Sequence, residues 1–144
     1  MGTTNYVDTF IAIAPDSAAD RGIAPREAEN PSIALRTYRM IRENPYRYTS
    51  DDVIFTVYAD RNGIRQQDRE EARRAFFSKG QACLRASDLG KRYGWGVHSD
   101  GTGCVALYGV ESAEYAAFVS GERAGSDGKA VAVVPAMRSR AAPK

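Results

Sequence analysis

KGQACLRASDLGKRYGWGVHSDGTGCVALY, residues 79–108, holds the only Trp, the only His and both Cys of the chain, together with closely spaced glycines. It predicts a short helix that leads into a hairpin. Ser87 is expected to cap the helix, and Gly94 suits the positive φ that often follows a helix. Trp95–Ser99 and 104–108 are then strands, since the DGTG between them favours a tight turn. Near the glycines we expect main chain that is open to a ligand.

Outside this stretch, clustered or alternating β-branched and aromatic residues predict further strands, and capping residues mark helices. The predicted strands are 5–14, 53–58 and 129–134, the predicted helices are about 30–43, 66–78 and 112–120, and the long polar loop is 16–29. Strand and helix do not alternate regularly along the chain. We therefore expect an α+β fold: a mainly antiparallel sheet of about five strands, with three or four helices packed mostly on one face.

The size and composition of the chain suit one globular domain. It has 144 residues, of which 43% are hydrophobic and 26% are charged, and its formal net charge is +2. This length supports one core, and this charge does not demand a polyanionic partner. No apolar stretch approaches the roughly 20 residues of a membrane span, and no secretory signal opens the sequence. We expect a cytoplasmic protein with reduced cysteines and one domain over residues 1–144, with a tail that frays after about residue 137.

Three segments together resemble one known family. They are NYVDTFIAIAPD near the start, ENPYRYTSDDVIFTVY in the middle, and FFSKGQACLRASDLGKRYGWGVHSDGTGCVALYGVESAEYAAF later in the chain. The family consists of small bacterial proteins known only as a domain of unknown function. The resemblance covers most of the chain and implies a bacterial cytoplasmic protein of similar length. It implies no activity, cofactor or catalytic residue, so the expected site rests on the residues themselves.

The central stretch also carries the best candidate for a binding site. Four basic residues lie between positions 79 and 98 against Asp88 alone, and Tyr93 and Trp95 follow two of these cations. Cations beside aromatic rings are typical of ligand clefts and of grooves for single-stranded nucleic acid. For Trp95 a buried core position is the favoured alternative, since a lone Trp is usually buried. The candidate ligand-binding residues are Arg85, Ser87, Lys91, Arg92, Tyr93, Trp95 and His98.

Three functions are compatible with this segment. The favoured one is a non-enzymatic protein that binds a small anionic or planar ligand there. The second is a nucleic-acid-binding protein that adds Arg138 and Arg140 to the same cations, although the net charge is modest. The third is a small enzyme with His98 as general acid or base, assisted by Tyr93 or Ser87. We expect no cofactor, and an exposed strand edge would permit a homodimer.

Cysteine and metal chemistry are weaker candidates. Cys83 lies near Arg85, in the electropositive setting that a reactive thiol needs, whereas Cys104 falls within a predicted strand. Buried, unreactive thiols remain the favoured reading of both. Cys83, His98, Cys104 and Asp100 could converge on a metal ion, but no Cys-x-x-Cys or similar paired spacing supports this. We therefore expect no metal site.

Overall fold

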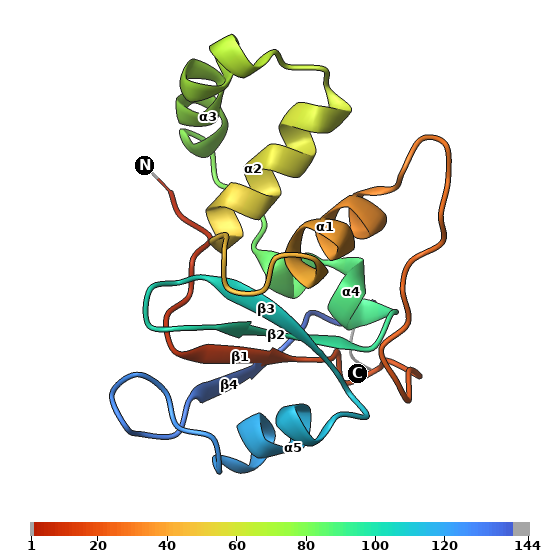
Figure 1. The fold of residues 1–144 in the computed structure, drawn as a ribbon, viewed down its shortest axis with the longest axis vertical. Coiled ribbons are helices and arrows are strands. Elements are labelled where there is room, and N and C mark those ends of the chain that lie inside the picture. The colour runs from red at the N-terminus through yellow and green to blue at the C-terminus, as the bar shows by residue number, and fades with distance from the viewer. Residues whose placement is uncertain (1, 140–144) are drawn as a thin grey trace, which may run out of the picture.

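The computed structural model describes residues 2–139 and has a four-stranded sheet at its centre (Figure 1). The strands lie in the order β3-β2-β1-β4. The predicted hairpin forms β2 (Trp95–Ser99) and β3 (Val105–Gly109), and β1 (Thr9–Ala12) pairs antiparallel with β2. β4 (Ala132–Pro135) joins the other edge of β1 in parallel, which makes the sheet mixed. The α+β class is confirmed, with four strands in place of about five.

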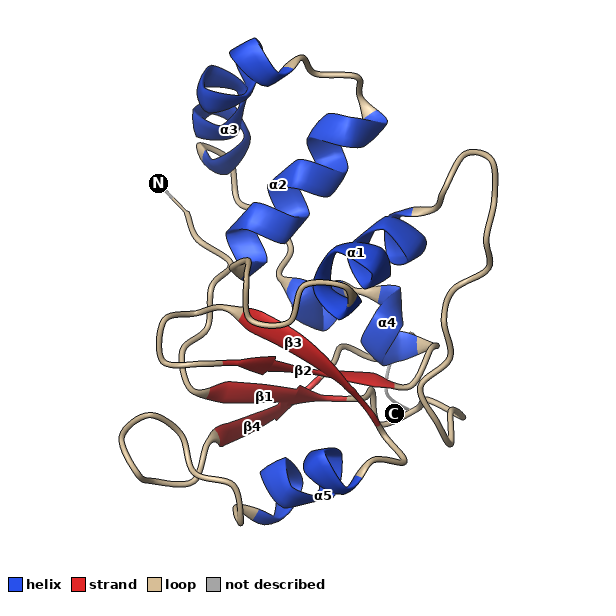
Figure 2. Cartoon of the chain, in the orientation of Figure 1, coloured by secondary structure: helices blue, strands red, loops and turns tan. Residues whose placement is uncertain are grey.

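Helices cover both faces of the sheet (Figure 2). In Figure 1, α1, α2, α3 and α4 lie on one side, with α3 farthest from the sheet, and α5 lies on the other side. The helices are α1 (Ile33–Arg42), α2 (Ser50–Arg61), α3 (Arg69–Phe77), α4 (Asp88–Lys91) and α5 (Ala113–Ser120), with single 3-10 turns at Gln66–Asp68 and Leu84–Ala86. Most of the helices therefore share one face, as the sequence predicts.

The alternation of side chains along β2 divides the core into two layers. Trp95 and Val97 belong to the larger buried cluster on the side of α1 and α4. On the α5 side, Phe10 stacks on Phe118 with ring centroids 4.8 Å apart. Gly96 must be glycine here, because a Cβ atom at this position would lie 2.3 Å from the ring of Phe10. The sheet is thus packed tightly on both faces.

The strand predicted at residues 53–58 is wrong, because these residues form the middle of α2. A capping box starts that helix: the Thr49 hydroxyl accepts from the N–H of Asp52, and the Asp52 carboxylate accepts from the N–H of Thr49, each at 3.1 Å. Val57 packs into the main core, whereas Phe55 packs toward α3. A helix buried on several sides lacks a single apolar stripe, so its periodicity does not distinguish it from a buried strand.

The helix cap predicted at Ser87 is confirmed. Ser32, Ser87 and Ser112 each accept a backbone N–H at the start of α1, α4 and α5. Gly94 and Gly121 have φ values of 77° and 82°, in the left-handed region that favours glycine.

The first and the last strand that the sequence predicts differ from the observed strands in length or position. The predicted strand 5–14 forms only Thr9–Ala12, and the predicted strand 129–134 moves to Ala132–Pro135. The N–H groups of Ala132 and Ala136 donate toward β1. The backbone nitrogen of Pro135 therefore faces the free edge of the sheet, where the lack of an N–H group loses no hydrogen bond of the sheet.

The C-terminal segment is bonded to the body as far as it is described. The N–H of Met137 donates to the carbonyl oxygen of Arg85 at 2.8 Å. The N–H of Ser139 donates to the carboxylate of Asp16 at 3.1 Å. Arg140, which the nucleic-acid hypothesis invokes, lies outside the described residues together with 141–144.

Candidate functional site

The cations that the sequence predicts to bind a ligand have different surroundings in the structure. Arg85 donates from Nε to the carbonyl oxygen of Pro135, 2.7 Å away, and so reaches toward β4. Arg92 is exposed, and its Nε lies 3.9 Å from a carboxylate oxygen of Asp88. Lys91 ends α4. None of the three cations lines either of the cavities described below.

Trp95 is a core residue, as the favoured alternative predicts. Its side chain is 6% exposed, and its Nε1 donates to the carbonyl oxygen of Ile23 at 2.9 Å. The Tyr38 ring lies 5.5 Å from the Trp95 ring, and the Arg42 guanidinium lies over it at 5.0 Å. With these neighbours in place, the indole has no open face on which a planar ligand could stack.

The prediction that glycines near Trp95 bare the main chain to a ligand is wrong. The predicted loop 16–29 crosses this region, and the N–H of Ile23 donates to the carbonyl oxygen of Tyr93 at 2.9 Å. A Cβ atom on Gly94 would lie 2.1 Å from the carbonyl oxygen of Arg21. Glycine is needed here because the loop packs directly against it.

His98 lies on the other face of the sheet, in a closed polar chain. Its Nδ1 is 2.8 Å from the Tyr46 hydroxyl, which is 2.8 Å from the Tyr108 hydroxyl. The Phe118 ring packs against the imidazole with centroids 4.3 Å apart. His98 Nε2 is buried without a hydrogen-bond partner in the described part of the chain. The residue is 7% exposed and lines neither cavity, whereas acid–base catalysis requires contact with a substrate.

Burial sets the charge of this polar chain. It lowers the pKa of His98 below its ordinary value, and the positive charge of Arg123 acts in the same direction. Burial likewise raises the pKa of Tyr46, aided by its hydrogen bond with the Tyr108 hydroxyl. Tyr46 also has a φ of 59°, in the left-handed region that residues other than glycine rarely adopt. At neutral pH the imidazole and the Tyr46 phenol are therefore uncharged and held in place.

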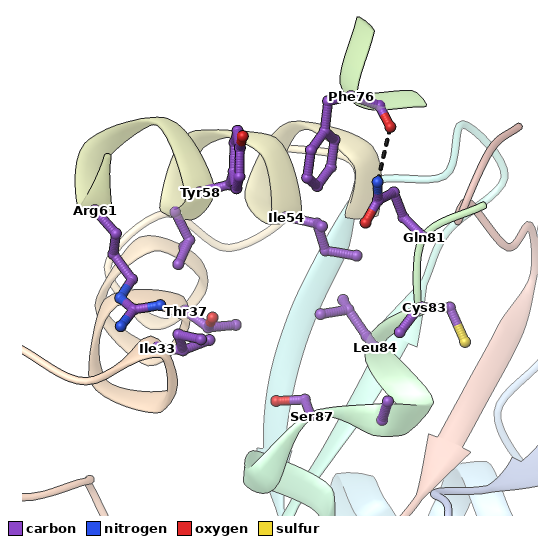
Figure 3. Close-up of a pocket in the computed structure, with 13 residues that line it drawn as sticks. Ile33, Thr37, Ile54, Tyr58, Arg61, Phe76, Gln81, Cys83, Leu84 and Ser87 are labelled. Carbon is purple, nitrogen blue, oxygen red and sulfur yellow. Dashed lines mark hydrogen bonds between the residues drawn. The ribbon is translucent and has the colours of Figure 1, made fainter. Parts of the chain in front are cut away.

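An open cavity of about 300 Å³ lies among α1, α2, the end of α3 and the segment 81–87 (Figure 3). Its walls are mostly apolar. The lining consists of Ile33, Thr37, Ile54, Val57, Tyr58, Arg61, Phe76, Gln81, Ala82, Cys83, Leu84, Ala86 and Ser87. Of the predicted ligand-binding residues, Ser87 is the one in this lining. We refer to this cavity as the cleft.

Local structure explains how the cleft forms. α1 and α2 contact each other, and α2 and α3 contact each other, which leaves α1 and α3 on either side of α2. After α3 the chain returns toward the sheet, where the 3-10 turn buries Leu84 in the main core. The returning segment then forms the wall opposite α2. At one end, Gln81 Nε2 donates to the carbonyl oxygen of Phe76 at 2.8 Å, the dashed line in Figure 3.

Cys83 lines the cleft, but its thiol does not face it. Its Sγ lies 3.5 Å from the Tyr6 hydroxyl, and Figure 3 shows the sulfur turned away from the cleft. This hydrogen bond raises the pKa of Tyr6. Among residues 2–139, no three His, Cys, Asp or Glu side chains are placed to hold a metal ion.

A second cavity, of about 380 Å³, lies on another side of α2 and differs in its chemistry. Its two arginines already have partners: Arg69 pairs with Asp60 at 2.9 Å, and Arg73 pairs with Asp52 at 2.8 Å. These two ion pairs join α3 to α2, so both arginines already have a carboxylate partner. The cleft is therefore the better candidate site.

Sequence reasoning missed the cleft because its residues come from three distant segments. Ile54, Val57 and Tyr58 fall in the stretch that was predicted as a strand, and a strand would place them in the sheet. The exposure that marks the cleft, 54% at Ile33 and 41% at Tyr58, can be read only from the structure.

Fold and cleft together define a small α+β protein with one apolar, partly open cavity between its helices and the returning chain. The chain belongs to a family of unknown function, DUF6157, whose family model matches residues 1–142. The family resemblance expected from the sequence is thus confirmed. No curated protein and no solved structure matches the chain. No helix in the described residues is long and apolar enough to cross a membrane.

Proposed function

We propose that this protein is a non-enzymatic binding protein that holds a small, largely apolar or planar molecule in the cleft. The observation that carries the proposal is the open cavity of about 300 Å³ with apolar walls and a few polar groups. Ligand sites are commonly pockets of roughly 300 to 1,000 Å³ with this composition. The volume lies at the lower end of that range and suits a compact ligand. The sequence predicts a small anionic or planar ligand at the segment around Arg92 and Trp95; the proposal keeps a small ligand but makes it largely apolar or planar and moves it to the cleft.

The exposed side chains of the cleft support the proposal. Ile33 and Tyr58 are both substantially exposed, and both line the cleft. The Tyr58 and Phe76 rings lie side by side with centroids 4.5 Å apart, and they form an aromatic wall. A ligand in the cleft would remove these surfaces from water, which is favourable at about 25 cal/mol per Å² of apolar surface.

The alternative functions have less support from the contacts. Nucleic-acid binding would rely on Arg85, Lys91 and Arg92, and two of these already contact Pro135 or Asp88. An enzyme based on His98 would need a route from solvent to a buried imidazole.

The proposal is tested by following the backbone amide signals of the labelled full-length protein during titration with 2-naphthol and with 1-octanol. We expect the largest shifts at Ile54, Leu84 and Ala86, and none at Val119 or Val133, which are exposed elsewhere.

A cavity-filling variant completes the test. Ala82 is exposed and lines the cleft, so Ala82→Trp should block binding without disturbing the core. Ala116→Trp, at an exposed position of α5, is the matched control and should bind normally. Saturating probe that shifts no cleft residue, or that shifts only residues around Arg92 and Trp95, would overturn the proposal.

A further inference from the structure

One side of the cleft gathers hydrogen-bonding side chains from three elements. Arg61 comes from the end of α2, Thr37 from α1, and Ser87 from the N-cap of α4, and all three line the cleft. Figure 3 shows Arg61 and Thr37 on the same side of the cleft, and the Ser87 hydroxyl points toward that side. Gln81 lies at the other end and is already bonded to Phe76. The cleft therefore has a polar end and an apolar body.

Arg61 is the one charged side chain among the described residues that line the cleft. The nearby Arg69 and Arg73 form ion pairs with Asp60 and Asp52. The guanidinium of Arg61, in contrast, has no ion pair and no hydrogen bond within residues 2–139. Its charge is available to an anion that enters the cleft.

Thr37 supplies a second unused group. It is 5% exposed, yet its hydroxyl has no hydrogen-bond partner in the part of the chain that the structure describes. Buried polar groups are nearly always hydrogen-bonded, and helical Thr commonly bonds back to a carbonyl of the preceding turn. His98 Nε2 is the one fully buried side-chain nitrogen or oxygen among the described residues that lacks a partner, so the Thr37 hydroxyl is not sealed and opens to the cleft.

Ser87 supplies a third group, oriented by its own helix. Its Oγ accepts the N–H of Leu89 at 3.2 Å, as an N-cap does. Accepting this bond leaves the Ser87 hydroxyl proton free to donate. Among the described residues that line the cleft there is no carboxylate to compete for these donors.

We infer that the ligand is a monocarboxylate with an apolar body, whose carboxylate binds Arg61 and accepts hydrogen bonds from Thr37 and Ser87. A carboxylate matches the planar fork of a guanidinium and can accept from several donors at once. A phosphate monoester carries close to two negative charges at pH 7 and would meet one cation only. The inference rests on the proposed function, since it names the ligand class of the same cleft.

Calorimetry with four probes that share one apolar chain tests this inference. The probes are octanoate, 1-octanol, octylamine and octyl phosphate, each titrated into the full chain at the same ionic strength. Octanoate should bind about tenfold more tightly than octanol, a difference of about 1.4 kcal/mol, and octylamine should bind most weakly.

Three variants assign the preference to residues. Arg61→Gln should reduce the affinity for octanoate to that for octanol and leave octanol unchanged, while keeping a good helix former at the end of α2. Thr37→Val, which keeps the shape and removes the hydroxyl, should weaken octanoate about threefold. Arg92→Gln is the matched control, because Arg92 is exposed and lies outside the cleft. It should bind all four probes like the unmodified protein.

The outcomes separate this inference from the proposed function. Equal affinities for octanol and octanoate, both unaffected by Arg61→Gln, would overturn the inference that the ligand is a carboxylate. The proposal that the cleft is a ligand site would then still stand. Tighter binding of octyl phosphate than of octanoate would also overturn it, in favour of a dianion. If none of the four probes binds, the proposed function falls together with the inference. A dimer that Ala82→Trp dissociates would assign the cleft to a second copy of the chain and would overturn both.

Discussion

The two faces of the sheet use polar side chains in opposite ways. Under α5, the buried His98 imidazole and the hydroxyls of the half-buried Tyr46 and Tyr108 bond to one another in a chain. On the side of the sheet that carries α1 and α2, Arg61 and Thr37 line an open cleft. Their side chains have no hydrogen-bond or ion-pair partner among the described residues. The closed face holds the residue type most associated with catalysis, and the open side holds ordinary residues. We therefore base the proposed ligand site on accessible polar groups without partners rather than on residue type.

The largest expected effect is a loss of stability, and the test compares an aromatic residue of the closed face, Phe118, with one of the cleft, Tyr58. Phe118 is fully buried against Phe10 and His98, so Phe118→Ala should lower the free energy of unfolding by about 3–5 kcal/mol. Tyr58→Ala, in the wall of the cleft, should cost no more than about 1 kcal/mol because its side chain is already partly in water. Urea unfolding measures both values. Similar costs for the two variants would remove the distinction between a closed and an open side.

The next effect tests whether the 16–29 loop covers the glycine-rich segment. Gly94 and Gly63 both have positive φ, but a Cβ at Gly94 would collide with Arg21, whereas no atom of residues 2–139 lies within 4 Å of a Cβ at Gly63. Gly63→Ala should cost about 1 kcal/mol from backbone strain, and Gly94→Ala at least about 2 kcal/mol, since the loop must also move. Thermal or urea unfolding of the pair gives the difference. Equal costs would mean that the loop does not pack on Gly94 in solution.

A smaller effect, in the pH dependence of stability, reports on the closed face. Burial lowers the pKa of His98 in the folded protein, so below its ordinary value of 6.5 the unfolded chain binds the proton more readily. Stability should be level above about pH 6.5 and fall as the pH drops toward 5.5, with a slope of up to about 1.4 kcal/mol per pH unit. His98→Gln should lose this slope. A wild-type profile that is flat across this range would show that the imidazole is open to water.

The smallest effect is expected where the sequence placed the site. Arg92→Gln removes an exposed charge whose nearest carboxylate is 3.9 Å away, so stability should change by less than about 0.5 kcal/mol. Unfolding at low salt measures this change. A loss of more than about 1 kcal/mol would show that the cation holds the segment together.

Local signals in the sequence predicted much of the fold around the central hairpin. Ser87 caps its helix through its own hydroxyl, and Gly94 permits a positive φ because it has no side chain. The structure reproduces the predicted helix, the β2 strand and the hairpin. The strand predicted at 53–58 failed because apolar β-branched residues suit any buried element. The capping box at Thr49 and Asp52 was the stronger indicator.

The candidate site could not be predicted in the same way. Whether Arg92 lies in a concavity depends on which segments pack above it, and the position of the 16–29 loop is set by contacts such as that of Ile23 with Trp95. The cleft likewise brings Thr37, Arg61 and Ser87 together only after α1, α2 and the returning chain have packed. Spacing along the sequence does not encode such proximity.

The most direct test of the cleft as the ligand site is a set of intermolecular nuclear Overhauser effects between octanoate and the methyl groups of the protein. Our account predicts contacts from the apolar chain of the probe to Ile54, Val57 and Leu84. Contacts to residues around Trp95 instead, or none at saturating probe, would contradict it.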